Sequence, residues 1–225
     1  GLNTLQGAFE KSSIERVKLA GTPKSTQDCF FMCESLQDVD LSLVDVSQTT
    51  ILGMPYSYGG FFQGCKALKS IDLRGVDFSK VVNAANMFRE CPALEEVLGI
   101  ENLTFSSNLT DISSYFYKSQ LWERVTLHWD VSSVTRANQV FYQVSALKYL
   151  DLSNLHFNTP CEFVYFMANN HNSLEEAYFG TIRPTSLKQF ATSCYLLHTL
   201  EFVSIDTSNC TSFYWTFNEC RKLQR

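Results

Sequence analysis

One pattern of apolar residues recurs along the whole chain and constrains its fold more than any other feature. In its clearest copy, Phe62 is followed by Cys65, by Leu68, and then by apolar residues at steps of three, two and three. Nine copies begin at positions 9, 30, 62, 88, 116, 141, 168, 191 and 217, a mean spacing of 26 residues. The first residue of each copy, its anchor, is Phe except at Ala168 and Ala191. Fixed periods of about 20 to 50 residues are typical of solenoids, so stacked coils are expected.

The middle of each copy predicts a short β-strand. Leu147, Leu150 and Leu152 show the spacing best, because the last two of these residues are two positions apart and lie on one face of a strand. A repeat of this length with a Leu-x-x-Leu-x-Leu segment indicates a leucine-rich-repeat arc. The strands of successive coils should form one parallel sheet.

The segment after each strand predicts the turn. Where the best-known repeats carry Asn or Cys, this chain has aliphatic residues, namely Val44, Val76, Leu103, Leu155, Ile182 and Ile205. Asp-x-Ser follows in several copies, as at Asp45 and Asp77, and this pattern suits a helix N-cap. We therefore expect an α/β repeat solenoid of about eight full repeats, with a parallel sheet on one face and short helical turns on the other.

Length and charge limit the classes of protein to consider. The 225 residues, 45% hydrophobic and 18% charged, suffice for one leucine-rich-repeat domain over residues 1–225. No apolar run is long enough to span a membrane. The formal charge of −5 and the lack of a lysine- or arginine-rich run argue against nucleic acid as a partner. The last copy stops at Leu223, within the strand motif, so we expect a fragment of a longer chain.

The eight cysteines fall at positions where other copies carry apolar residues. Five of them lie three residues after an anchor, where Val144 stands in another copy. They are therefore interpreted as free, buried, small apolar residues. The alternative is a disulfide between neighbouring coils, where cysteines such as Cys65 and Cys91 would stack.

Chemistry-bearing motifs are lacking. The chain has no nucleophile elbow, phosphate loop or zinc-ligand spacing, so we expect no catalytic residues, no metal and no cofactor. Adjacent carboxylates such as Glu95 and Glu96 should point to opposite faces of a strand and should not act together. A solenoid of this kind also offers no obvious pocket, so no enzyme is expected.

The combined motif resembles a known family. Met-Phe-x-x-Cys-x-x-Leu-x-x-Val/Ile-x-Leu, followed by Asp-x-Ser-x-Val, is similar to the BspA-like leucine-rich repeats of bacterial surface antigens. The likeness extends from Phe9 to Leu223. The resemblance implies a surface-displayed or secreted solenoid used for adhesion or protein binding, without catalytic residues in the motif.

The strand pattern also predicts which side chains point outward. Of the sixteen outward positions in the predicted sheet, seven are acidic and three are basic, so an acidic sheet face is expected. Tyr149 and Tyr178 fall on consecutive strands and should form an aromatic patch. The expected ligand-binding residues are this pair with its flanking carboxylates and two further acidic residues of the same face: Tyr149, Tyr178, Asp151, Glu176, Asp72 and Asp40. Equally, the tyrosines could form a cross-strand pair that only stabilises the sheet.

Two functions follow as hypotheses. The first is a monomeric, non-enzymatic binding or adhesion module, on the cell surface or secreted, that presents its sheet face to a protein or glycan. The second is an architectural spacer that holds another domain away from the cell envelope. Clustered aromatic residues and a biased charge on the sheet would favour the first, and evenly mixed polar residues would favour the second.

Overall fold

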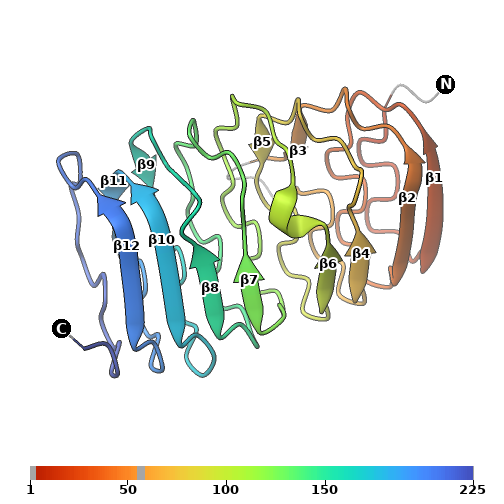
Figure 1. Ribbon diagram of the computed structural model, residues 1–225. Coiled ribbons are helices and arrows are strands. Elements are labelled where there is room, and N and C mark those ends of the chain that lie inside the picture. The colour runs from red at the N-terminus through yellow and green to blue at the C-terminus, as the bar shows by residue number, and fades with distance from the viewer. Residues whose placement is uncertain (1–3, 55–58, 225) are drawn as a thin grey trace.

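The chain winds into a parallel β-solenoid in the computed structural model, which describes residues 4–54 and 59–224 (Figure 1). Both ends of the domain expected over 1–225 thus lie outside the described residues. Each coil contributes one strand to the face nearest the viewer in Figure 1, which we call the strand face. Its eight strands are β1 (Arg16–Gly21), β2 (Asp38–Val44), β4 (Ser70–Asp72), β6 (Glu96–Leu98), β7 (Arg124–Thr126), β8 (Tyr149–Leu152), β10 (Glu176–Ile182) and β12 (Thr199–Ile205).

The register of these strands confirms the predicted alternation. Val125, Leu150, Ala177 and Leu200 align across β7, β8, β10 and β12, and the first three are fully buried. The residues on either side of each point away from the core. A period of two therefore separates core from surface along β4, β6, β7 and β8, as the sequence predicts, whereas β2, β10 and β12 lose it toward their carboxyl ends.

A second, shorter ladder lies on the opposite side of the coils. It contains β3 (Ile51–Gly53), β5 (Asn83–Ala84), β9 (Cys161–Glu162) and β11 (Pro184–Ser186). Isolated bridges at Asp111 and Arg136 continue it between β5 and β9. The Arg136 side chain donates to the fully buried carboxylate of Asp111 at 2.7 Å, so this ladder includes an ion pair.

The predicted helical turns are wrong. The one helix among the described residues is η1, a 3-10 turn at Ile100–Asn102. The anchor segments are instead runs of β-turns with left-handed residues on both sides of the anchor, as at Asn86 (φ 60°) and Glu90 (φ 58°) around Phe88. Their N–H groups bond to the next coil rather than along a helix, since Phe88 and Glu90 donate to the carbonyls of Tyr115 and Tyr117. We call the surface formed by these segments the turn face.

The Asp-x-Ser motif also has a different role from the helix cap expected of it. In the copies that begin at Asp45, Asp77, Asp130 and Asp206, the carboxylate accepts the N–H of the Ser two residues later, at 2.8–3.0 Å. This geometry is an Asx-turn, which reverses the chain locally without a helix. The motif therefore marks the corner between the strand face and the second ladder.

The anchor phenylalanines stack into a column in the core. Neighbouring rings lie 5.3–6.0 Å apart from centroid to centroid through Phe9, Phe30, Phe62, Phe88, Phe116 and Phe141. The seventh anchor is Met167 rather than Ala168, because the backbone N–H of Met167 bonds to the next coil in the same way as the backbone N–H of the anchor Phe141 does. Ala191 holds the eighth anchor position, as predicted.

Hydrogen bonding on the strand face is interrupted twice. The strands form three separate sheets, β1–β2, β4–β6 and β7–β8–β10–β12. Within a sheet, the N–H groups that precede or begin a strand bond to the previous coil, as Lys148 and Tyr149 both bond to the carbonyl of Glu123. Among the described residues, no such bond joins β4 to β2 or β7 to β6. The single predicted sheet is thus three sheets with two breaks.

Candidate functional site

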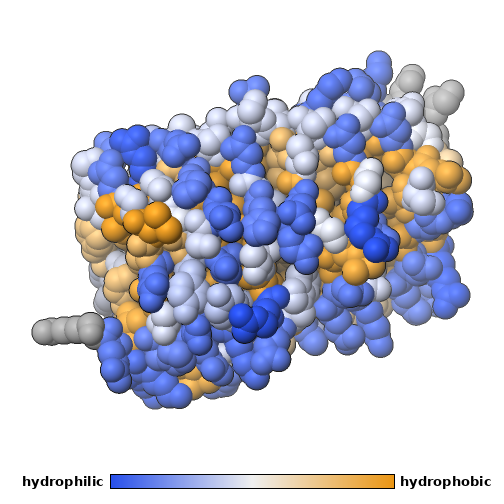
Figure 2. Space-filling view, viewed as in Figure 1, coloured by the Kyte–Doolittle hydropathy of each residue, from blue (hydrophilic) through white to orange (hydrophobic). Residues whose placement is uncertain are grey.

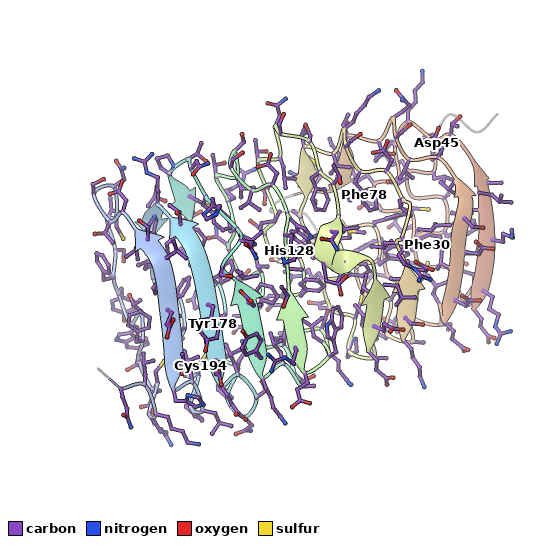
Figure 3. All side chains as sticks on the ribbon, in the orientation of Figure 1. Phe30, Asp45, Phe78, His128, Tyr178 and Cys194 are labelled. Atoms are coloured by element: carbon purple, nitrogen blue, oxygen red, sulfur yellow. The ribbon has the colours of Figure 1, made fainter. Side chains whose placement is uncertain are left out.

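The predicted tyrosine pair is present on the strand face. Tyr149 on β8 and Tyr178 on β10 occupy diagonal positions, because Tyr149 aligns with Glu176 and Tyr178 aligns with Asp151. Their ring centroids are 5.4 Å apart, and both side chains are half-buried. Figure 3 shows Tyr178 on the front of β10. The structure therefore brings together four of the six predicted site residues, Tyr149, Asp151, Glu176 and Tyr178.

A basic residue extends this patch. Arg124 on β7 aligns with Tyr149, and its guanidinium lies 3.8 Å from the centre of the Tyr149 ring, in a cation–π contact. On the other side, the Tyr178 hydroxyl donates to the Glu176 carboxylate at 2.7 Å, and this bond raises the pKa of Tyr178 to about 12. We call Arg124, Tyr149, Tyr178 and Glu176 the tyrosine patch. Its side chains are held in place before any partner binds.

The other two predicted site residues lie apart from this patch. Asp40 is on β2 and forms an ion pair with Lys18 at 2.7 Å. Asp72 is on β4 and accepts two bonds from the Arg74 guanidinium, at 2.7 and 2.9 Å. These cations hold the pKa of both carboxylates below their usual range. The predicted acidic face is therefore partly neutralised at its N-terminal end.

A groove opens over β6, beside the break between β6 and β7. Its volume is about 1050 Å³, and it is lined by the segment after β4 (residues 73–79), by β6, by η1 and by Trp122. His128, labelled in Figure 3, borders η1, since its N–H bonds to the Glu101 carbonyl and its ring lies 3.2 Å from the Asn102 side-chain oxygen. The expectation that the solenoid has no pocket is thus wrong.

The sequence contains two signals for this groove, both departures from the repeat. Gly99 stands where other copies have Leu73 or Leu152, and Trp122 stands where other copies have the first leucine of the strand motif. Glu95 and Glu96 also depart from their prediction. Both are exposed and both line the groove, because β6 begins only at Glu96 and Glu95 is still in the preceding turn.

Large apolar side chains are exposed in the last described coil. Figure 2 shows apolar surface over the carboxyl end of β12, where Val203 and Ile205 lie. Phe213, Tyr214, Trp215 and Phe217 are also exposed. These positions are covered by the next coil elsewhere, as at Ile182 and Phe116, which are both buried.

The cysteines are buried or half-buried and unpaired in the structure. That their thiols are free in solution stays a prediction. Burial raises the pKa of Cys29, Cys91 and Cys194 to about 12, which disfavours the reactive thiolate. Residues 4–54 and 59–224 contain no group of three or more His, Cys, Asp or Glu side chains placed to hold a metal ion. No membrane-spanning helix is found in that part of the chain.

Two family models match the sequence. A model described as "Mycoplasma protein of unknown function, DUF285" matches residues 56–178, which is more than half of the chain. A model described as "BspA type Leucine rich repeat region (6 copies)" matches residues 3–53. No curated protein and no solved structure matches. The repeating coils and the two matches agree, and the chain therefore belongs to the DUF285 family, with leucine-rich repeats of the BspA-like type.

Proposed function

We propose that the chain is a monomeric, non-enzymatic binding module, on the cell surface or secreted, that presents its strand face to a protein or glycan ligand. The BspA-type match supports a role in surface protein binding or adhesion in general. The fold supports the same role, because stacked coils give an extended, rigid surface with little to order on association.

The single observation that carries this proposal is the tyrosine patch. Tyr149 and Tyr178 are half-exposed, and Arg124 and Glu176 contact their rings or hydroxyls, so the patch is preorganised. Tyrosine and arginine are enriched among residues that dominate binding energy at interfaces. The paired tyrosines favour a binding surface over a spacer, which would need no aromatic cluster.

The chain offers a matched control for testing this patch. Tyr117 and Tyr142 form a second stacked pair on the turn face, with ring centroids 4.9 Å apart. Arg89 lies over the Tyr117 ring at 3.9 Å, just as Arg124 lies over Tyr149. The two pairs therefore have the same chemistry but lie on different faces, and removing either should cost similar stability.

The test compares two double variants on an array of purified extracellular-matrix proteins and oligosaccharides. Tyr149→Ser with Tyr178→Ser should weaken binding of the retained array member at least about tenfold, because two interface tyrosines are lost. Tyr117→Ser with Tyr142→Ser should change it less than about twofold. Equal binding by the first variant and the parent would remove the strand face from the proposal. A parent that binds no array member would favour the spacer.

A further inference from the structure

The groove over β6, beside the break to β7, is built into the chain by local departures from the repeat. Gly99 adopts φ 83°, a left-handed conformation that favours glycine, and a Cβ there would lie 2.9 Å from the Arg74 side chain. The chain then forms η1 instead of continuing the strand. In the next coil, Trp122 replaces the buried leucine of other copies and stays half-buried at the groove wall.

The charge lining the groove is predominantly negative. Asp77, Glu95, Glu96 and Glu101 all line it, and the four residues are exposed. The one basic residue in its wall, Arg74, is already bound through both guanidinium contacts to Asp72. Such a groove attracts cations and repels phosphate, sulfate or carboxylate ligands.

Trp122 is the tryptophan with no stacking partner among the described residues. Trp129 packs on Phe105 and donates its indole N–H to the Ile100 carbonyl at 2.7 Å. Trp215 stacks on Tyr214. The Trp122 indole makes neither kind of contact within residues 4–54 and 59–224, although it packs against the edge of the core. An aromatic face beside several carboxylates is the arrangement that binds an organic cation.

We propose that this groove binds a lysine or arginine side chain from a basic segment of a protein partner. The cation would lie against the Trp122 indole, with Glu95, Glu96 and Glu101 supplying the opposite charge. The inference rests on the proposed function in taking the strand face as the binding surface. It narrows the ligand to a protein with an exposed basic segment, because the carboxylates and the indole of the groove suit a cationic side chain. Trp122 of the groove lies two residues before Arg124 of the tyrosine patch.

The experiment measures binding of a fluorescent peptide of alternating lysine and glycine by anisotropy at low ionic strength. One variant carries Glu95→Gln, Glu96→Gln and Glu101→Gln, which remove charge at nearly constant size. Its control carries Glu10→Gln, Glu15→Gln and Glu201→Gln, three exposed residues outside the groove that change the net charge equally. A second comparison pairs Trp122→Leu with Trp215→Leu.

The groove triple variant should bind the peptide at least about tenfold more weakly, and its control should stay within about twofold. Trp122→Leu should weaken binding about threefold or more, and Trp215→Leu should not. The proposal would be overturned if the two triple variants lost binding equally or if the parent did not bind the peptide. It would also be overturned if the parent bound a glutamine–glycine peptide equally well, or if it bound a neutral oligosaccharide through Trp122. The double variant Tyr149→Ser with Tyr178→Ser should still bind the peptide. A failure of the proposed function at the tyrosine patch can therefore be distinguished from a failure of the groove proposal.

Discussion

The position three residues after each anchor donates a hydrogen bond in most coils. The thiols of Cys33, Cys65, Cys91, Cys194 and Cys220 lie 2.7–3.3 Å from the carbonyl of the preceding coil's anchor. Ser119 and Asn170 donate to the same kind of carbonyl. The interpretation of this position as simply apolar was thus incomplete, because a buried carbonyl favours a partner and the small Cys thiol supplies a weak one.

Replacing Cys91 distinguishes the two roles of this position. Cys91 is fully buried and donates to the Phe62 carbonyl at 3.1 Å. Cys91→Ala removes the donor and leaves a small void, so it should lower the free energy of unfolding by about 1–3 kcal/mol. Cys91→Ser retains a donor, as Ser119 does naturally, and should cost less than Cys91→Ala. Urea titration of both variants measures the difference, and a serine variant no more stable than the alanine one would mean that only packing matters.

At the scale of the element, the assignment of which strand residues face the core can be tested directly. Leu150 is fully buried in β8, and Lys148, just before this strand, is exposed and pairs with Glu123 at 2.8 Å. Leu150→Ala should lower the free energy of unfolding by roughly 2–5 kcal/mol, because the surrounding coils cannot collapse into the space. Lys148→Ala should cost no more than about 0.5 kcal/mol, since exposed ion pairs contribute little. Denaturant titration measures both free energies of unfolding. Comparable losses for the two variants would mean that the assignment of inward and outward residues in β8 is wrong.

The strands could be predicted from the sequence, whereas the turns could not. Strand burial follows directly from side-chain alternation, which the spacing of Leu147, Leu150 and Leu152 displays. The turns depend on left-handed backbone at residues such as Glu90 and Lys118, which are not glycine and carry no sequence signal for it. That conformation is sustained by bonds between coils, as from Lys118 to the Tyr142 carbonyl, and these are long-range contacts. The Asp-x-Ser motif, interpreted locally as a helix N-cap, therefore predicted helical turns that the structure does not contain at these segments.

The same division holds for the candidate site. Tyr149 and Tyr178 could be placed side by side because strand register in a repeat follows from the period. The separation of Asp40 and Asp72 from them follows from the period as well, because β2 and β4 precede β8 by several coils. The cations that neutralise both carboxylates depend on side-chain positions that no period gives. The groove lies where Gly99 and Trp122 violate the pattern, so a search for matches to the repeat passes over it.

On the scale of the whole molecule, the two breaks divide a solenoid that is otherwise continuous. The phenylalanine column runs through both breaks without interruption, since Phe30 stacks on Phe62 and Phe88 stacks on Phe116. The turn face is continuous as well, because Phe88 bonds to the coil of Tyr115. Within residues 4–54 and 59–224, only the strand face is interrupted. Cohesion between neighbouring coils therefore comes from the core and the turns at β2–β4 and at β6–β7, and local opening is confined to one face.

Amide hydrogen exchange should reveal these breaks at matched positions. The N–H groups of Glu95, Lys148, Glu175 and His198 bond to the previous coil at 2.7–2.9 Å, whereas those of Lys69 and Glu123, at the same place in their coils, make no backbone bond among the described residues. Because exchange requires an amide to be released from its bond, Lys69 and Glu123 should exchange at least about tenfold faster than Lys148 and Glu175, after correction for sequence effects. Equal protection at all of these amides, measured by NMR in the folded chain, would mean that the strand face is one continuous sheet in solution. Fast exchange at Glu123 alone would instead mean that the break between β6 and β7 is present in solution and the break between β2 and β4 is not.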